Sequence, residues 1–458
     1  MPLEHPDGLP TPRRYWSILA IWLAVTMAVL DGSIANVALP TIAAELHAPA
    51  AVSIWIINAY QLAITALLLP LAALGDRIGY RRVYLPGLGI FVVGSVACAL
   101  AHTLGTLIAA RMFQGIGAAA IMSLNAALVR ATFPRAQLGR IIGFNALVMS
   151  IAAAAGPTIA ALILSVGSWS WLFLINVPIG IVSMLMGTRA FPHTVGHGGS
   201  PQYVSAVLSA VALSTLVYGI EALSRGGVAI GVPVLVVAVV TGMLLVHRDW
   251  RRPAPLLPVD LLRIPIFTLS ICSSIISFAA QMLALVVLPF LLQGVLNRSV
   301  AETGLLMTMW PVAIGVIAPL AGKLADHYPA GLLGGIGLIV LASGLLALSM
   351  LGTSPSNADI IWRMALCGAG VGFFQSPNNR TMVSAAPRAR SGAAGGMLAT
   401  ARLLGQSAGA VGAAAGFHWA GVGSGHLLLR FAAAAAVVGA VTSTLRLRVP
   451  VHAADMNP

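Results

Sequence analysis

An acidic residue interrupts the first apolar run of the chain. Asp31 lies in the stretch LDGSIANVALP, and the apolar sequence that begins at Trp16 continues beyond it. A carboxyl group in a low-dielectric environment favours its neutral form, which suits a group that takes up and releases protons. The alternative is a structural aspartate that hydrogen-bonds to Asn36 or to a serine of a neighbouring helix. Asp31 is the first candidate for a functional site.

A second polar group occurs in the stretch RMFQGIG. Arg111 and Gln114 lie three positions apart, so a helix places them on the same face. A buried guanidinium beside a carboxyl group favours the ionised carboxylate and thereby promotes release of its proton. Alternatively, Arg111 extends to the membrane surface and buries only its stem. Arg402 interrupts a later apolar run and needs a partner or a wet cavity, so a role in substrate binding or gating stays open.

Composition indicates that these residues lie in a membrane. Of 458 residues, 59% are hydrophobic and 8% are charged, and the mean hydropathy is +0.94, which excludes an ordinary soluble protein. The net charge of +13 comes from scattered arginines without the basic arm of a nucleic-acid-binding protein. The three cysteines form no CxxC pair, and neither a GxxxxGK[ST] motif nor a nucleophile–base pair occurs. We therefore expect no metal, no cofactor and no enzymatic activity.

Apolar windows of about 20 residues predict membrane-spanning helices. Fourteen such windows occur, near 16–38, 53–74, 84–102, 105–129, 139–164, 170–190, 203–223, 229–247, 266–294, 303–323, 331–351, 360–383, 392–416 and 426–445. With the N-terminus in the cytoplasm, the cytoplasmic connections receive nineteen basic residues and the outer loops two. The positive-inside rule expects this asymmetry, so we predict a multi-pass protein of the cell inner membrane with both termini in the cytoplasm.

A repeat divides the chain into two similar halves. The stretch PLAALGDRIGYRR (70–82) precedes the third span, and PLAGKLADHYPAG (319–331) precedes the eleventh. Likewise RMFQGIGAA (111–119) is similar to RMALCGAGVG (363–372), which pairs Arg111 with Arg363. We predict an all-α integral membrane protein with one six-helix bundle in 1–190, two extra spans within 191–265, and a second six-helix bundle in 266–458. Repeated halves around a central site are typical of alternating-access transporters.

Five motifs together resemble a known family. The stretch GDRIGYRR between spans two and three resembles the signature loop of the major facilitator superfamily. With LDGSIANVALP, WIINAYQL, RMFQGIG and WSWLFLINVPIG, in this order and with a two-span insert, the chain resembles the fourteen-span drug:proton antiporters of that superfamily. The resemblance implies the major facilitator fold. It also implies that Asp31, Arg111 and Gln114 take part in proton coupling or substrate binding.

The span-five motif of that family is only partly present. Gly156 and Pro157 match it, but Ala160 and Ala161 replace its paired glycines. The resemblance associates this helix with antiport, so the direction of coupling stays open. Alanine is still small enough for close helix packing.

The same resemblance implies a cytoplasmic gate in the loop between spans two and three. In the family, the aspartate of this loop contacts an arginine that ends span four and the N-terminus of a second-half helix, which attracts carboxylates. In this chain the corresponding positions are Asp76, Arg130 and the start of span thirteen near Ser391. The expected gate residues are Asp76, Arg77, Gly79, Arg81 and Arg130.

The sequence favours a proton-driven exporter of lipophilic, cationic drugs or toxic compounds, as in multidrug efflux and drug resistance. We expect a monomer whose partners are a small-molecule substrate, a proton and the lipid bilayer. Asp31 is the only carboxylate deep in a predicted span, which fits monocations better than dications. The alternative within transport is an exporter or importer of a single metabolite. A membrane enzyme or sensor would need a catalytic constellation or a soluble domain, and the sequence contains neither.

Overall fold

The computed structural model describes residues 8–134, 137–194, 203–224, 226–249, 259–385 and 391–449, and every regular element in these ranges is a helix. The first half contains α1 (Arg13–Glu45), α2 (Ala50–Ser53), α3 (Trp55–Ile78), α4 (Tyr80–Ala99), α5 (Leu104–Thr132), α6 (Leu138–Val166), α7 (Ser170–Leu174) and α8 (Asn176–Ala190). The middle contains α9 (Tyr203–Ser224), α10 (Val228–Asp249) and η2 (Val259–Arg263). The second half contains α11 (Pro265–Phe290), η3 (Leu291–Val295), α12 (Val300–Leu324), α13 (Ala330–Ser349), α14 (Asn357–Ala385), α15 (Ser391–Ala420), η5 (Val422–Ser424), α16 (Gly425–Leu445) and η6 (Arg446–Arg448).

Fourteen of these helices have 15 residues or more, one for each predicted span. Eleven helical segments in the described chain are long and apolar enough to cross a membrane, with α2–α3 and α7–α8 each counted as one. The helix α9 contributes a shorter apolar stretch, Val204–Ile220, and α14 and α15 are not among the eleven. The all-helical prediction is therefore confirmed, whereas a count of fourteen membrane crossings stays a prediction.

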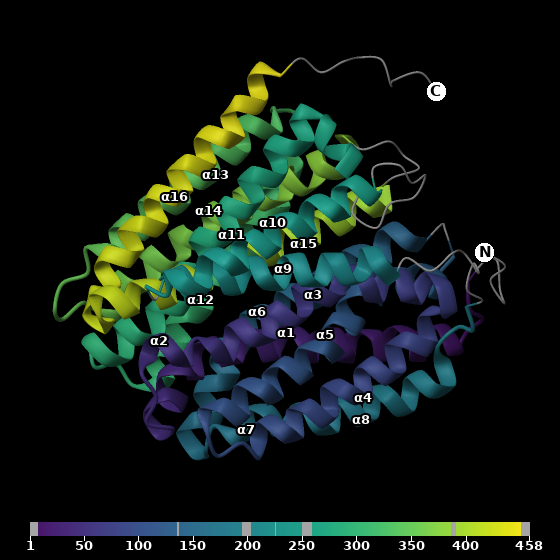
Figure 1. Cartoon of the computed structure of the whole chain (residues 1–458), viewed down its shortest axis with the longest axis horizontal. Helices are drawn as coiled ribbons and strands as arrows, with labels where there is room; N and C mark the ends of the chain where they lie inside the picture. Colours follow the sequence, from purple (N-terminus) through teal and green to yellow (C-terminus); the bar gives the residue numbers. More distant parts are fainter. Residues whose placement is uncertain are drawn as a thin grey trace.

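The two halves repeat the same packing pattern. In the first half α5 packs between α3 and α4, and α1 packs against α6 and α8. In the second half α14 packs between α12 and α13, and α11 packs against α15 and α16. Figure 1 shows the helices of both halves running across the view, with α1 beginning and α16 ending at the same end of the bundle.

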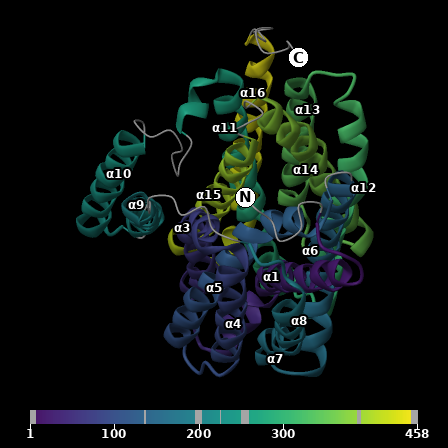
Figure 2. The same ribbon diagram turned by 90° about the vertical axis from the view of Figure 1, so that its right-hand side faces the viewer.

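The inserted helices α9 and α10 form a pair of their own. They pack mainly against each other, and α9 also contacts α3 and α15. Figure 2 places this pair at the side of the two bundles, with α10 outermost. The pair therefore lies beside the junction of the halves rather than between them.

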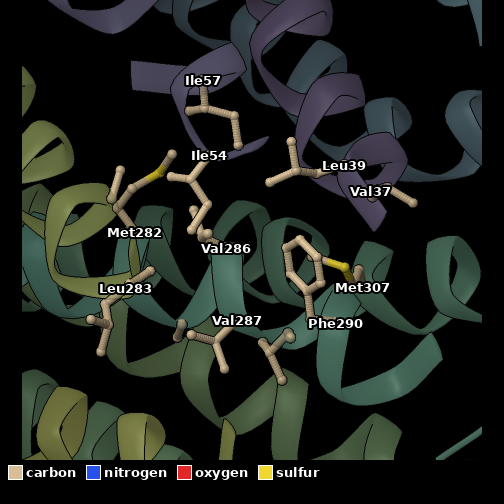
Figure 3. Packing of buried hydrophobic residues seen from close by; sticks show 14 of the residues in the cluster. Val37, Leu39, Ile54, Ile57, Met282, Leu283, Val286, Val287, Phe290 and Met307 are labelled. Carbon is tan, nitrogen blue, oxygen red and sulfur yellow. The ribbon is translucent and has the colours of Figure 1, made fainter. Parts of the chain in front are cut away.

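One end of the molecule is closed by apolar contacts between the halves. Val37, Leu39, Ile54 and Ile57 from the first half share a buried core cluster with second-half residues such as Phe290. Figure 3 shows these side chains facing Met282, Leu283, Val286, Val287, Phe290 and Met307. They lie beside the connections α1–α2 and η3–α12, at the end of the bundle that the sequence leaves poor in arginine. We call this the arginine-poor end.

A polar and backbone contact between α6 and α12 joins the halves near the same cluster. The hydroxyls of Thr158 and Thr308 lie 2.7 Å apart. A Cβ atom on Gly304 would lie 2.4 Å from the carbonyl oxygen of Pro157, so only glycine permits this approach of α12 to α6. The tight packing indicates that the halves are closed against each other on this side.

Cross-linking tests whether the closed end exists in solution. The double variant Thr158→Cys with Thr308→Cys, made after replacement of the native cysteines, should form a disulfide rapidly under mild oxidation in the absence of substrate, because the two hydroxyls are in contact. Mass spectrometry of the cleaved protein measures the linked peptide. Each single-cysteine variant serves as the control, and a double variant that links no faster than random collision would contradict the closed contact.

Candidate functional site

Asp31 and Arg111 form an ion pair in the interior of the first half. Asp31 projects from α1, and Arg111 from α5, seven residues after that helix begins at Leu104. The Oδ2 of Asp31 accepts a hydrogen bond from Nη1 of Arg111, and both side chains are 1% exposed. A buried charge pair is stable only when further hydrogen bonds satisfy its remaining donors and acceptors. The neighbouring side chains supply them.

Two amides complete the coordination of the carboxylate. The Oδ1 of Asp31 accepts from Nε2 of Gln114 and from Nδ2 of Asn176, each at 2.9 Å. Gln114 also donates to the hydroxyl of Ser95 (2.9 Å) and accepts from Arg111 (2.6 Å). The carboxylate therefore receives three donors, one of them charged.

Arg111 is held on three sides. Its Nε donates to the backbone carbonyl of Ile56 on α3 at 3.1 Å. Its guanidinium carbon lies 4.1 Å from the centre of the Tyr60 ring and 5.5 Å from that of Phe173, which places the cation over two aromatic faces. Arg111 does not extend to the membrane surface. The site thus joins α1, α3, α4, α5, α7 and α8.

Sequence reasoning identified the charged centre and missed most of its surroundings. Asp31, Arg111 and Gln114 come together as the motifs suggest, whereas the motifs assign no role in this site to Tyr60. Ser95, Asn176 and Phe173 were not assigned. Asn176 carries the same signal as Asp31, because it is a strongly polar residue inside the apolar stretch WSWLFLINVPIG.

The second half lacks an equivalent site. A Cβ on Gly94 would meet Gln114, and a Cβ on Gly344 would meet Cys367 at the equivalent helix crossing, so Cys367 takes the place of Gln114. Three residues earlier in each helix, Met364 then takes the place of Arg111.

The pairing of Arg111 with Arg363 across the repeat is therefore wrong by one residue. Arg363 instead forms an ion pair with Asp359 at 2.9 Å, at the surface end of α14. A helical shift of one residue turns a side chain by about 100°, which explains why Arg363 faces away from the position that Arg111 occupies.

The span-five proline links its helix to the helix of Asp31. Pro157 has no N–H, so the carbonyl of Ala153 has no partner from that position within α6. The hydroxyl of Ser33, two residues after Asp31 on α1, donates to this carbonyl at 3.1 Å. A Cβ on Gly156 would lie 2.3 Å from the same hydroxyl, so Gly156 leaves room for the contact.

The expected gate residues surround the short loop between α3 and α4. Asp76 is exposed and accepts from the hydroxyl of Tyr80 at 2.9 Å, and Arg130 donates to the carbonyl of Ala126 at 3.4 Å. Within the described residues, the expected contact between Asp76 and Arg130 is not made in this conformation. In the second half, Asp326, which the repeat aligns with Asp76, forms an exposed ion pair with Arg380 of α14.

The segment after α8 holds the same loop from the other side. Gly79 has φ +100° and lies against the carbonyl oxygen of Thr194, so this position favours glycine. The N–H of Tyr80 donates to the hydroxyl of Thr194 (2.8 Å), and Arg81 donates to Nε2 of His193 (2.7 Å). The start of the linker to α9 is therefore fixed to the loop that the sequence assigns to the gate.

Comparison with known proteins identifies the family. The family model described as Major Facilitator Superfamily matches residues 21–410. The chain belongs to this superfamily. Its members are transporters rather than enzymes, and the apolar helices agree with a multi-pass membrane protein.

Relatives within the major facilitator superfamily extend over nearly the whole chain. The chain is 52% identical over 453 residues to the "Uncharacterized transporter YebQ" of Escherichia coli (strain K12), which covers 98% of this chain and 99% of that protein. It is 31% identical to the riboflavin transporter RibZ of Clostridioides difficile, with 86% of each chain covered. It is also 31% identical to the multidrug efflux pump LfrA of Mycolicibacterium smegmatis, with 87% and 80% covered.

Solved structures show the same fold at low sequence identity. A crystal structure of a POT family transporter in complex with a thioalcohol-conjugated peptide superposes with a TM-score of 0.73 at 14% identity, covering 95% of this chain and 96% of that one. An inward-facing, unoccupied bacterial homologue of the lysosomal transporter Spinster gives a TM-score of 0.67 at 14% identity, covering 96% and 98%. This major facilitator chain thus has a fold that solved transporters share.

A double-mutant cycle tests whether Asp31 and Arg111 stabilise each other. Arg111→Met should lower the free energy of unfolding by about 3–5 kcal/mol, because it leaves the Asp31 carboxylate buried without its cation. The double variant Asp31→Asn with Arg111→Met should be more stable than the single variant Arg111→Met. Thermal unfolding of the purified protein measures the order of stability. Additive losses in the double variant would contradict the direct pairing.

Proposed function

We propose that the protein is a proton-coupled exporter of lipophilic toxic compounds that works by alternating access. The observation that carries this proposal is the buried Asp31–Arg111 pair, attached to the helix end that closes the arginine-poor side. Arg111 donates to the carbonyl of Ile56, and the adjacent Ile57 packs across the junction in the apolar cluster of Figure 3. A change in the charge of Asp31 is therefore passed through Arg111 to Ile56, which is adjacent on α3 to a residue of the closed contact.

Protonation supplies such a change. With Asp31 ionised, Arg111 has its counter-ion and holds α3 in place. A proton on Asp31 removes the charge of that partner and leaves a buried guanidinium with neutral acceptors only, which is costly in a low-dielectric interior. The cost is relieved when Arg111 moves or water enters, and either event loosens the contact at Ile56. In this scheme the proton releases the closed end and the halves rock against each other.

The orientation of the cycle follows from the charges of the loops. The positive-inside rule assigns the arginine-rich end and both termini to the cytoplasm of the inner membrane, so the closed arginine-poor end faces outward. The loop of Asp76, Arg77, Gly79, Arg81 and Arg130 then lies at the cytoplasmic side. We propose that Asp76 contacts Arg130 and the N-terminus of α15 when that side closes. In this conformation Asp76 is bound to Tyr80 instead.

The substrate class depends on whether Asp31 is available to bind the substrate. The sequence favours lipophilic cations, and the multidrug efflux pump LfrA is among the relatives at 31% identity. In the described chain, however, Asp31 already accepts from three donors and is 1% exposed. We therefore propose that Asp31 carries the proton and does not bind the substrate directly. A lipophilic substrate is then held by groups other than Asp31, and the protein acts as a monomer.

A narrow transporter of one metabolite is the second candidate. The observation that favours it is the equal identity, 31%, to the riboflavin transporter RibZ. A carrier of a single metabolite would use the same Asp31–Arg111 pair for proton coupling, and its binding region would accept fewer compounds. Riboflavin is therefore included as a test compound.

Proton movement in inverted membrane vesicles tests the proposed function. Vesicles from an efflux-deficient bacterium that expresses the protein carry an imposed pH gradient, and a pH-sensitive dye reports proton release when a lipophilic cation, a lipophilic acid or riboflavin is added. Wild type should show substrate-dependent proton release, and Asp31→Asn should lose it, because asparagine cannot exchange a proton.

Asp359→Asn is the matched control, since Asp359 is also paired with an arginine but lies at the exposed start of α14. It should behave as wild type. Full activity of Asp31→Asn would remove Asp31 from the coupling mechanism. A response to riboflavin alone would favour the narrow transporter over the broad exporter.

A further inference from the structure

Arg402 is a second arginine inside the bundle, and the Asp31 site does not use it. It lies near the middle of α15. Its Nε is fully buried and has no hydrogen-bond partner. In the described ranges of the chain, no carboxylate lies within ion-pair distance of it. The side chain as a whole is half-buried, but a buried donor without an acceptor costs about 1–3 kcal/mol, so this guanidinium is poised for a partner that the described chain does not provide.

Two other buried arginines show how the chain satisfies such a group. Arg111 has a carboxylate and two further acceptors. Arg446, 4% exposed at the end of α16, donates to Oδ1 of Asn378 (2.7 Å) and to the hydroxyl of Ser270 (3.0 Å). Arg402 has neither kind of partner, although the same helical scaffold surrounds it. This difference indicates that Arg402 has a role other than stabilising the fold.

The position of Arg402 is the junction between the halves. The next residue, Leu403, is buried in the core cluster of the first half. One turn further, Gln406 accepts from Nε2 of Gln61 on α3 at 2.9 Å. On the opposite side, Gly405 packs against the backbone of α11. By helical angle Arg402 lies between Gly405 and Gln406, so its side chain leaves α15 between the side that contacts α11 and the side that contacts α3.

We infer that Arg402 is the recognition site for an acidic group on the transported compound. The ligand class is a lipophilic organic acid, in which a carboxylate or sulfonate binds the guanidinium and the apolar body lies between the halves. A planar guanidinium suits this task because it donates two parallel hydrogen bonds to one carboxylate. This inference rests on the proposed export function and specifies its substrate.

The charge of Arg402 also decides against the opposite substrate class. A cationic group placed beside an uncompensated guanidinium is repelled. The carboxylate that would attract a cation, Asp31, is already bound by Arg111, Gln114 and Asn176. Lipophilic acids are therefore preferred over lipophilic cations of the same shape.

Equilibrium binding to the full-length protein in lipid nanodiscs tests the inference. The probes share one biphenyl body and carry a carboxylate, a carboxamide or a trimethylammonium group, with empty nanodiscs as the background. Wild type should bind the carboxylate about tenfold or more tightly than the carboxamide, and the trimethylammonium most weakly. R402Q should lose the preference for the carboxylate. R402K keeps the charge without the planar fork, so its preference should be intermediate.

Arg363→Gln is the matched control, because Arg363 is a partly buried arginine that Asp359 already neutralises. It should keep the wild-type preference. Thermal unfolding and gel filtration test whether R402Q is folded. If R402Q is not folded, the preference of R402K for the carboxylate decides the test. A wild-type protein that binds the carboxylate no better than the carboxamide, or that binds none of the probes, would overturn the inference. A carboxylate preference that survives in R402Q or is unchanged in R402K would do the same.

The binding assay and the vesicle assay fail independently. Binding at equilibrium needs no proton movement, so the preference for the carboxylate is measured whether or not the protein is an antiporter. A normal preference without proton release in vesicles would keep the Arg402 site and reject antiport. Proton release with cations and no carboxylate preference would keep antiport and reject the Arg402 site.

Discussion

The structure depends on one constraint, which is that a charge in an apolar interior needs its counter-charge. Asp31 and Arg111 satisfy each other, and Gln114 and Asn176 occupy the remaining acceptor positions of the carboxylate. Removing one charge is costly because the other remains buried. A proton changes this balance without breaking a covalent bond or moving a large group, so the pair is suited to convert proton binding into movement.

The Asp31–Arg111 pair is connected to the helices that contact the second half. Arg111 binds the backbone of α3 beside the residues that close the arginine-poor end, and Ser33 on the helix of Asp31 binds the carbonyl that Pro157 leaves free on α6. Helices α3 and α6 are among the main first-half contacts with the second half, through α15 and α12. In the described second half, Met364 and Cys367 occupy the corresponding positions, so the charged pair is not repeated there.

The sequence predicts the helices and the charged centre because both depend on local pattern. Apolar windows mark the helices, and a lone aspartate or arginine in such a window stands out. It does not predict Asn176, Ser95 or Tyr60 as partners, because those contacts depend on how distant helices cross. It also assigns the wrong repeat counterpart to Arg111. The sequence alignment of α5 with α14 differs by one residue from the alignment that the helix contacts give. The proposed contact between Asp76 and Arg130 depends on the conformation, and in this one Asp76 accepts from the hydroxyl of Tyr80 instead.

Electron paramagnetic resonance measures the distance across the closed end and tests most directly whether the Asp31–Arg111 pair holds that end closed. Spin labels at Glu45→Cys and Val295→Cys, both exposed and on opposite halves, report it in protein whose native cysteines are replaced. Without substrate, wild type should give a single short distance, whereas Asp31→Asn should add a longer population, because Arg111 has then lost its counter-charge. The same short distance in both proteins would contradict the proposal that the Asp31–Arg111 pair holds this end closed.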